Sequence, residues 1–386
     1  MNCAALLAAR AKNVSSPRTS RSIADARDEP RREPIGSPGE RLRDRLAART
    51  ARGDLAAWDG PDVLRCTACA HRCGLRDGQA GACGVRARAG RDLRVPFGYV
   101  ARRHVRAIET NTVFHVRPGA RALTFGMFGC DLRCPYCHNW RVSQALREGL
   151  DDERPIDATP ASLVDEAVAA GAAALCAAYN EPMIAAEWNR AVFAEAKRRG
   201  LATVLVSDGN TTGEALAYMR STADVYRVDL KGFADDQLRE LGGRLRPVLD
   251  GIAEAKRLGF WVEVVTLVVP GLNDDLAGLR ALAARLAEID RDIPWHVNGF
   301  VPRHRWRDRA RPDAAFLVAA AGAGYARGLR FVYAGNSLSS PVDELAHTRC
   351  PGCHAVVVRR RDFAAEMVAV REGRCPRCER PLPGLW

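Results

Sequence analysis

One short segment constrains this chain more than any other. Cys130, Cys134 and Cys137 lie in the run Gly-Cys-Asp-Leu-Arg-Cys-Pro-Tyr-Cys-His-Asn, which has the spacing C-x3-C-x2-C. Three thiolates from one loop can ligate three irons of a cubane cluster and leave the fourth iron open to another molecule. A structural zinc ion takes four ligands, and a neighbour such as His138 rarely reaches the metal that the adjacent cysteine binds. The loop therefore predicts an iron-sulfur cluster that does chemistry rather than storing electrons.

The other cysteines support metal binding as well. The chain has 13 cysteines, and outside the groups only Cys3 and Cys176 stand alone. Because no hydrophobic signal segment is evident, we expect metal ligation in a reducing, cytoplasmic compartment rather than a disulfide scaffold. Two further groups of four flank the loop: Cys66, Cys69, Cys73 and Cys83 towards the N-terminus, and Cys350, Cys353, Cys375 and Cys378 at the C-terminus.

The C-terminal group has the spacing of a zinc ribbon. Cys350 with Cys353, and Cys375 with Cys378, form two C-x2-C pairs. Paired knuckles of this kind typically close a tetrahedral zinc site. A structural zinc would stabilise a module too small to fold alone, so we predict zinc here. A rubredoxin-like iron site is the alternative.

The N-terminal group has a less specific spacing, C-x2-C-x3-C-x9-C. Four thiolates can close a zinc site or anchor an auxiliary iron-sulfur cluster, and spacing does not decide between the two. We slightly favour a closed structural site and keep the auxiliary cluster as the alternative.

The amino-acid composition limits the kinds of partner that we expect this chain to have. The net charge is +12, and residues 1–53 carry twelve basic against six acidic residues. The remaining excess is diffuse and gives no nucleic-acid signal, and no apolar run approaches the roughly 20 residues of a membrane span. Residues 1–55, rich in Arg, Ala, Ser and Pro, are predicted to be a disordered basic tail. A transit peptide is the weaker interpretation of this segment.

Hydrophobic periodicity predicts an α/β fold. From about residue 120, short apolar runs typical of strands alternate with amphipathic helical stretches. Serial βα units favour parallel strands, and the segment is shorter than the ~250 residues of a closed eight-unit barrel. We therefore expect an open, partial (β/α)6 barrel. The expected strands cover residues 123–128, 174–179, 203–207, 225–230, 262–268 and 295–300, and the expected helices include residues 162–170, 184–198 and 276–289.

The chain then divides into four segments. We predict the tail at residues 1–55, a Cys-rich N-terminal module at 56–115, the barrel core at 116–342 and a zinc-ribbon-like module at 343–386. Functional residues of such a core lie at the carboxyl ends of the strands.

Polar side chains recur at these strand ends. Glu181 could accept hydrogen bonds from a ligand ammonium, and Lys231 could pair with a carboxylate. Ser207 or Asp229 could engage ribose hydroxyls, and His296 lies in the sixth strand. Loop capping would explain any one of them, but their recurrence favours a site for a nucleoside that carries an amino acid.

With these motifs the chain resembles the radical S-adenosylmethionine (SAM) superfamily. The motif C-x3-C-x-aromatic-C after a first strand is the superfamily signature, and Cys-Pro-Tyr-Cys-His-Asn resembles the activating enzymes of pyruvate formate-lyase. Within that group the chain resembles the radical SAM component of the AmmeMemoRadiSam system. The phrases that carry this resemblance include residues 66–86, Cys-His-Asn-Trp at 137–140, Tyr-Asn-Glu-Pro at 179–182, Val-Asp-Leu-Lys-Gly at 228–232, Val-Glu-Val-Val-Thr-Leu at 262–267, Pro-Trp-His at 294–296 and Tyr-Ala-Gly-Asn at 333–336.

The resemblance implies specific ligands. The three cysteines would hold a [4Fe-4S] cluster whose open iron binds SAM, and Glu181, at the end of a Gly-Gly-Glu-like motif, would contact the SAM amino group. Tyr136 would contact the adenine of SAM. Asp229, Lys231 and His296 would complete the pocket, with Glu181 and Lys231 at the catalytic centre. There are three departures: Asn180 stands in place of a glycine, Val206 in place of an Asp of the activating enzymes, and Asp208 in place of the Asn that relatives more often have before Gly209.

The resemblance also implies a reaction. A reduced cluster would cleave SAM to a 5'-deoxyadenosyl radical that abstracts hydrogen from an unidentified substrate, with an electron donor such as flavodoxin or ferredoxin as partner. The alternative is a glycyl-radical activase that acts on a partner protein. A non-catalytic metal-binding adaptor is disfavoured because the three cysteines and Glu181 are all present.

Overall fold

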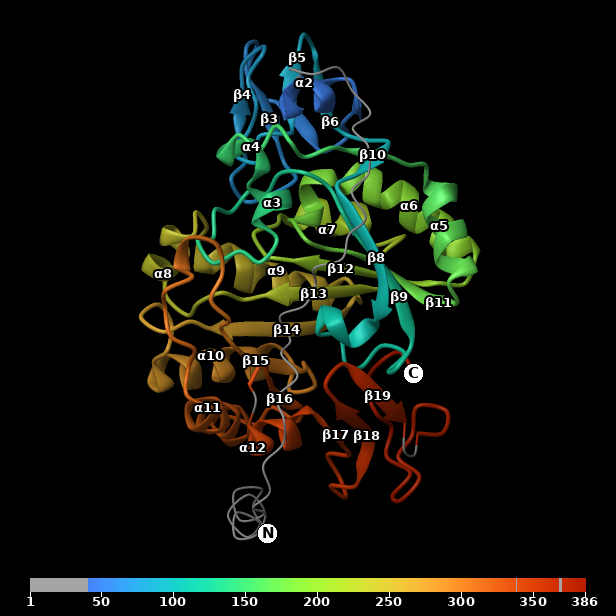
Figure 1. The fold of residues 1–386 in the computed structure, drawn as a ribbon, viewed down its shortest axis with the longest axis vertical. Coiled ribbons are helices and arrows are strands. Elements are labelled where there is room, and N and C mark those ends of the chain that lie inside the picture. Colours follow the sequence, from blue (N-terminus) through green and yellow to red (C-terminus); the bar gives the residue numbers. More distant parts are fainter. Residues whose placement is uncertain (1–40, 338, 368–369) are drawn as a thin grey trace. The chain divides into compact units, whose positions relative to one another are not determined.

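One large sheet organises the chain in the computed structural model, which describes residues 41–337, 339–367 and 370–386 (Figure 1). The eight strands follow the order β16-β15-β14-β13-β12-β11-β9-β8. All neighbours pair in parallel except β8 and β9. The strands are β8 (Arg102–Ala107), β9 (Arg121–Gly126), β11 (Ala172–Ala177), β12 (Ala202–Ser207), β13 (Val225–Asp229), β14 (Trp261–Val268), β15 (Trp295–Gly299) and β16 (Val332–Gly335).

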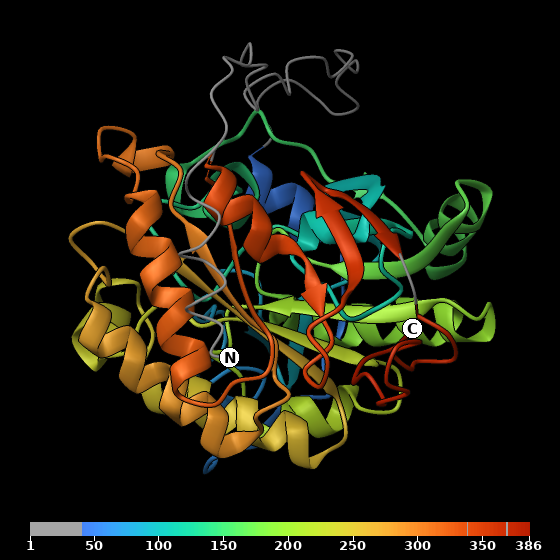
Figure 2. The same ribbon diagram turned by 90° about the horizontal axis from the view of Figure 1, so that it is seen from below.

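Helices cover the outer face of this sheet and connect its strands (Figure 2). The strands are rich in buried Val, Leu and Ala because both faces of a covered parallel sheet are apolar. Side-chain caps fix several helix starts: Thr159 forms a capping box with Ser162, and Asp275 accepts from two backbone N–H groups. The helices are α5 (Pro160–Ala169), α6 (Ala186–Arg198), α7 (Gly213–Met219), α8 (Asp235–Glu240), α9 (Leu245–Arg257), α10 (Leu276–Ile289) and α11 (Ala314–Ala326).

The expected α/β fold with a parallel sheet is confirmed, and the sheet extends further than we predicted. All six expected strands lie within two residues of their observed bounds, and α10 has the bounds that we expected. β16 is an additional parallel strand, and β8 adds an antiparallel edge. Three arginines and a histidine in the sequence Arg-Arg-His-Val-Arg-Ala of β8 obscure its strand pattern. β16 has only four residues, too few for a periodicity signal.

Small antiparallel elements form the N-terminal module at one end of the sheet. Two three-stranded sheets have the orders β1-β6-β5 and β2-β3-β4, and β7 pairs with β10. Residues 41–55, which we assigned to the tail, carry α2 (Leu42–Ala47) and β1, so the structure begins before the boundary that we predicted; residues 1–40 lie outside the described residues. The strands are β1 (Thr50–Arg52), β2 (Ala56–Trp58), β3 (Leu64–Cys66), β4 (Gly74–Leu75), β5 (Ala87–Ala89), β6 (Asp92–Pro96), β7 (Tyr99–Val100) and β10 (Ile156–Asp157).

The C-terminal module is a three-stranded antiparallel sheet, β17 (Thr348–Arg349), β18 (Val356–Arg361) and β19 (Ala364–Met367). Arg360 of β18 joins it to the core. Its guanidinium donates to the Phe114 carbonyl (2.6 Å) and to the Thr348 hydroxyl (2.7 Å), and it lies 3.7 Å from the Glu109 carboxylate. Both ionic side chains are buried, so the module docks through a desolvated charge pair.

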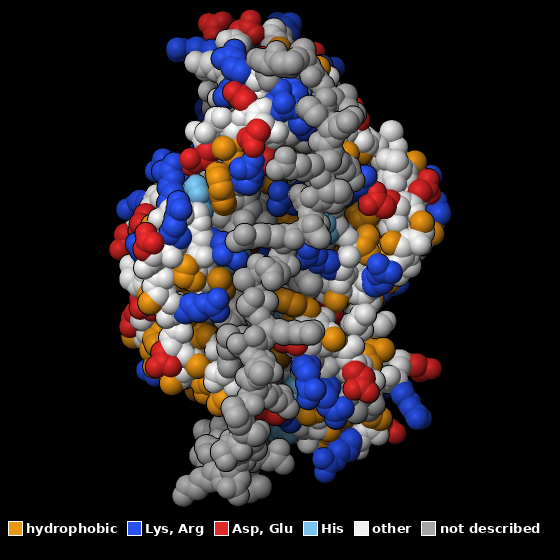
Figure 3. Space-filling view, in the orientation of Figure 1, with side chains coloured by type: hydrophobic (Ala, Val, Ile, Leu, Met, Phe, Trp, Pro, Cys, Tyr) orange, Lys and Arg blue, Asp and Glu red, His pale blue; other side chains and the backbone are white. Residues whose placement is uncertain are grey.

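Figure 3 shows basic side chains interspersed with acidic ones over the described part of the face drawn. In the described part of the chain, no helix has the length and apolar character needed to span a membrane.

The buried Arg360 generates a prediction about stability. In R360A the Glu109 carboxylate and the Phe114 carbonyl would remain buried without their partner, so we expect the free energy of unfolding to fall by about 3–5 kcal/mol. R359A is the matched control, because Arg359 pairs with Glu366 at the surface and its loss should cost about 0.5 kcal/mol or less. Chemical denaturation followed by circular dichroism measures both values. Equal stability of the two variants would contradict the role of Arg360.

Candidate functional site

The three-cysteine loop follows β9 at the carboxyl edge of the sheet, as expected. Cys130 and Cys134 are buried and Cys137 is partly buried, in a cluster with the side chains of Leu241 and Phe300. The Cys137 sulfur lies 3.1 Å from the Ser143 hydroxyl. The sequence-predicted ligands therefore lie together in a largely water-excluded part of the core.

Tyr136 forms an aromatic wall beside these cysteines. Its ring lies 5.3 Å from Trp306 and 6.2 Å from Phe300, measured between centroids. Its hydroxyl is buried and has no hydrogen-bond partner among the described residues. Buried polar groups are rarely left unpaired, so this hydroxyl is available for a hydrogen bond to a bound molecule.

Glu181 follows β11 and is held by the neighbouring strand end. Its carboxylate accepts from the Ser207 hydroxyl (2.9 and 3.0 Å), from the Asp208 amide (2.7 Å) and from the Met183 amide (2.9 Å). Burial raises the pKa of Glu181 well above its usual range, and the nearby Asp208 carboxylate raises it further. The arrangement fixes the carboxylate in a dry environment that disfavours its negative charge.

Two further carboxyl groups lie between Glu181 and the cysteine loop. The Cys130 sulfur is 3.8 Å from the Asp208 carboxylate and 3.9 Å from that of Asp131. Burial, followed by the Glu181 charge, raises the pKa of Asp131 to about 6, and Asn210 donates to the Asp131 carboxylate (2.8 Å). Sequence reasoning did not assign a role to either aspartate. Their positions could have pointed to such a role, because Asp131 lies inside the cysteine motif and Asp208 lies at a strand end.

Lys231 and Asp229 lie together at the end of β13, as the strand-end pattern predicted. The Lys231 ammonium is 3.4 Å from the Asp229 carboxylate, which also accepts from Arg227 (2.5 Å). Burial opposes the charge of Lys231, but Asp229, Cys134 and Tyr136 outweigh it and raise the pKa of this lysine. Lys231 thus provides a positive charge on the same side of the site as Cys134 and Tyr136.

His296, in β15, belongs to a different set of contacts. Its Nε2 lies 2.8 Å from the Glu263 carboxylate, and its ring stacks on Tyr333 at 4.9 Å. Glu263 also accepts from the backbone N–H groups of Phe114 and His115. These contacts join β14 and β15 to the Phe114 segment, which Arg360 of the C-terminal module also contacts. A role of His296 in SAM binding stays a prediction.

The backbone before Glu181 has an unusual conformation. Tyr179 has φ +71°, in the left-handed region that favours glycine. Asn180, the departure noted above, accepts from the Met127 amide through its side chain (3.1 Å) and so ties the end of β11 to the segment after β9. The side chain of Asn180 therefore holds in place a turn that carries local strain.

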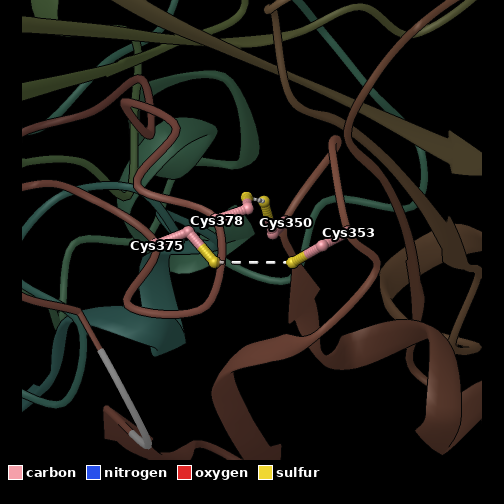
Figure 4. A group of neighbouring side chains, drawn as sticks. All are labelled: Cys350, Cys353, Cys375 and Cys378. Atoms are coloured by element: carbon pink, nitrogen blue, oxygen red, sulfur yellow. Dashed lines mark hydrogen bonds between the residues drawn. The ribbon is translucent and has the colours of Figure 1, made fainter.

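The C-terminal cysteines come together in one closed cluster (Figure 4). The sulfur-sulfur distance is 3.5 Å between Cys350 and Cys378, and 3.6 Å between Cys353 and Cys375. Ligands at about 2.3 Å from a tetrahedral zinc ion lie about 3.8 Å apart, so the spacing fits such an ion.

Comparisons with known proteins agree with this site. Residues 125–283 match the model of the radical SAM superfamily. An uncharacterized protein of Methanocaldococcus jannaschii is 30% identical over 320 residues, which are 82% of this chain and 93% of that protein. The chain belongs to the radical SAM superfamily.

Two further similarities are weaker. The pyruvate formate-lyase-activating enzyme of Staphylococcus aureus is 27% identical over 209 residues, which are 49% of this chain and 79% of that enzyme. A radical SAM methyltransferase from Sphaerobacter thermophilus is similar in structure, with a TM-score of 0.44 and 13% identity over 77% of this chain and 80% of that one.

Membership of the radical SAM superfamily makes the chain an enzyme and implies a [4Fe-4S] cluster and SAM. The residues present fit both groups. Three cysteines share one buried loop, the Tyr136 hydroxyl lacks a partner among the described residues, and the acidic side chains around Cys130 provide a place for a cationic ligand.

The buried His115 generates a prediction about how stability depends on pH. Burial lowers the pKa of His115 to about 4, with Glu263 opposing this shift and Arg360 and His296 adding to it. An unfolded chain binds the extra proton below about pH 6.5, so the wild type should lose about 3 kcal/mol of stability between pH 6.5 and pH 4 through this residue.

The variant H115Q isolates that contribution, because a glutamine does not titrate. We expect the stability of H115Q to fall less steeply than that of the wild type over this range, as measured by denaturation at a series of pH values. Metal sites also lose ligands in acid, but they do so in both proteins. Equal slopes would rule out His115 as the source.

Proposed function

We propose that this chain is the radical SAM component of an AmmeMemoRadiSam-type system. It would cleave SAM reductively at a [4Fe-4S] cluster held by Cys130, Cys134 and Cys137, and the resulting radical would act on a substrate not yet identified. The sequence phrases given above support the assignment to this system, and the geometry of the carboxyl edge supports the chemistry.

The observation that carries the proposal is a set of three buried carboxyl groups next to the cysteine loop. Glu181, Asp208 and Asp131 lie in a dry environment together with Cys130, which itself becomes anionic when it ligates iron. A cation placed among these carboxyl groups would favour their ionised forms. The amino group and the sulfonium of SAM provide positive charge, and Glu181 is the carboxylate that would accept from the amino group.

Other residues of the site suit the rest of SAM. Lys231 would pair with the SAM carboxylate, and Asp229 would accept from a ribose hydroxyl. Tyr136 would contact the adenine through its ring and could give its unpaired hydroxyl a partner. Ser207 acts through Glu181, because its hydroxyl donates to that carboxylate. His296 is the least supported member of this set because its contacts are with Glu263 and Tyr333.

When bound, the reduced cluster and SAM supply a 5'-deoxyadenosyl radical that takes a hydrogen atom from the substrate. The chain's own part is to fix SAM and to exclude water, which the burial of Cys130, Cys134 and Tyr136 supports. A one-electron donor of the flavodoxin or ferredoxin class would be the partner.

A second candidate function is activation of a glycyl-radical enzyme. The observation that favours it is the 27% identity to the activating enzyme from Staphylococcus aureus. In this case the hydrogen would come from a glycine of a partner protein. Electron paramagnetic resonance (EPR) detects a glycyl radical directly, and its appearance on an added partner would favour this function over action on a small molecule.

The proposed site predicts SAM cleavage that depends on Glu181. Anaerobically reconstituted protein, given SAM and dithionite, should form 5'-deoxyadenosine, detected by mass spectrometry. In E181Q the amino group of SAM loses its charged acceptor, which is worth about 1.5–3 kcal/mol, so kcat/KM for SAM should fall about 10- to 150-fold.

Two controls accompany this measurement. E240Q removes an exposed carboxylate at the end of α8 and should cleave SAM like the wild type. Iron content should be the same in all three proteins, which separates a loss of SAM binding from a loss of the cluster. If the loaded wild type forms no 5'-deoxyadenosine, the proposed function is wrong.

For the C-terminal module we propose a structural zinc ion. Its support is the closed geometry of Cys350, Cys353, Cys375 and Cys378, whose sulfurs lie within 4.8 Å of one another. A three-stranded sheet of this size has little core of its own, and structural zinc supplies about 10–16 kcal/mol of apparent binding energy in comparable peptides.

Replacing one of these ligands predicts a specific loss of metal. C375S should lose about one zinc per chain, with the iron content unchanged, because three cysteines no longer close the tetrahedron. C176S is the matched control, since Cys176 is a buried cysteine of the core strand β11. Elemental analysis by mass spectrometry measures both metals. Loss of iron instead of zinc from C375S would favour the rubredoxin-like alternative.

A further inference from the structure

The N-terminal cysteines form a second site that the proposed reaction does not use. Cys66 ends β3, and its amide donates to the Cys73 carbonyl (2.9 Å). The Cys73 sulfur accepts from the Ala82 amide (3.3 Å), and Cys83 follows in the same turn. All four thiols are free, and three of them are buried: Cys66, Cys69 and Cys83. One small, loop-rich module thus gathers four potential thiolate ligands.

The spacing of these sulfurs differs from that of the C-terminal group. Among the described residues, Cys350, Cys353, Cys375 and Cys378 bring their sulfurs within 4.8 Å of one another, whereas no three of the N-terminal cysteines do so. The sulfurs around one zinc ion lie only about 3.8 Å apart. A cubane spreads its thiolates over four separate iron corners and so needs a wider set. The same chain therefore contains a closed cysteine set and a wider one.

Arg86 gives the wider set a buried hydrogen-bond donor that suits an anionic sulfur. Its Nε donates to the Cys66 sulfur (3.2 Å), while its two terminal nitrogens donate to the Glu187 carboxylate (2.7 and 2.9 Å). Arg86 is 1% exposed and Glu187 7% exposed, so the donor is fixed in a dry environment. A buried arginine N–H is a strong donor to a thiolate, and hydrogen bonds to ligand sulfurs are one way in which proteins set cluster potentials.

The wider set packs directly on the three-cysteine loop. A side chain at Gly129, which precedes Cys130 and has φ +94°, would place its Cβ 2.8 Å from the Cys83 carbonyl oxygen. Arg147 donates to the carbonyls of Ala82 and Cys130, both at 2.7 Å. The two cysteine loops are therefore in direct backbone contact, which supports a close spacing of the metals that they would bind.

We propose that Cys66, Cys69, Cys73 and Cys83 bind a second [4Fe-4S] cluster, fully ligated by the protein and adjacent to the cluster of the three-cysteine loop. With a protein ligand on each iron this cluster has no open position for SAM. Its chemistry is limited to the gain and loss of one electron. Only its position beside a first cluster depends on the proposed function.

The test removes one cysteine set at a time from the full chain. After anaerobic reconstitution with iron and sulfide, the wild type should hold about eight irons. The variant C130A/C134A/C137A should keep about four irons and show, after reduction with dithionite, an EPR signal that SAM does not change. The variant C66A/C69A/C73A/C83A should also keep about four irons, with a signal that SAM does change. C176S is the control with the full complement.

The outcomes separate this inference from the proposed function. If C130A/C134A/C137A holds no iron and two zinc ions per chain, the N-terminal site is a structural zinc site and the inference is wrong, while SAM cleavage by the wild type can still stand. The reduced wild type should also show an EPR spectrum broadened by interaction of two neighbouring spins. A spectrum equal to the sum of the two variants' spectra would rule out adjacent clusters.

Discussion

The parallel register of the central sheet is the constraint on which the rest of the structure depends. Hydrogen bonding aligns Ala177 with Phe125 and Leu205, and Asp229 with Val265, so that successive strands end at one edge. The three-cysteine loop, Glu181, Ser207, Asp229 and Lys231 all lie at that edge. A shift of one residue in any strand would turn its side chains to the opposite face and would remove its contribution to the site.

Charge in a dry environment is the second theme. Glu181, Asp208 and Asp131 are buried beside Cys130, and in the ligand-free chain this environment disfavours their ionisation. Carboxyl groups perturbed in this way often mark functional sites, and a cationic ligand would favour their ionised forms. Elsewhere the chain offsets buried charge internally: Arg86 with Glu187 in the N-terminal module, and Arg360 at the docked C-terminal module.

The three cysteine groups show how one ligand type serves different geometries. The C-terminal sulfurs have the spacing that a zinc ion needs, and the central loop offers three ligands with buried carboxyl groups beside them. The N-terminal set is wider and receives a hydrogen bond from a buried arginine. The count of thiolates alone could not separate the first group from the last, because both have four. The distances between sulfurs depend on how the surrounding loops pack, and a spacing pattern in sequence does not contain that information.

The sequence by itself determined the features that are local along the chain: the three-cysteine loop, the paired knuckles, and strands and helices whose apolar periods are long enough to be recognised. It also located Glu181, Asp229 and Lys231, because parallel strands end at a common edge. Only the tertiary structure decided that Asp131 and Asp208 meet Glu181, that His296 pairs with Glu263, and that β16 and β8 extend the sheet. Those outcomes depend on contacts between residues far apart in sequence, which are fixed by strand register and packing rather than by local pattern.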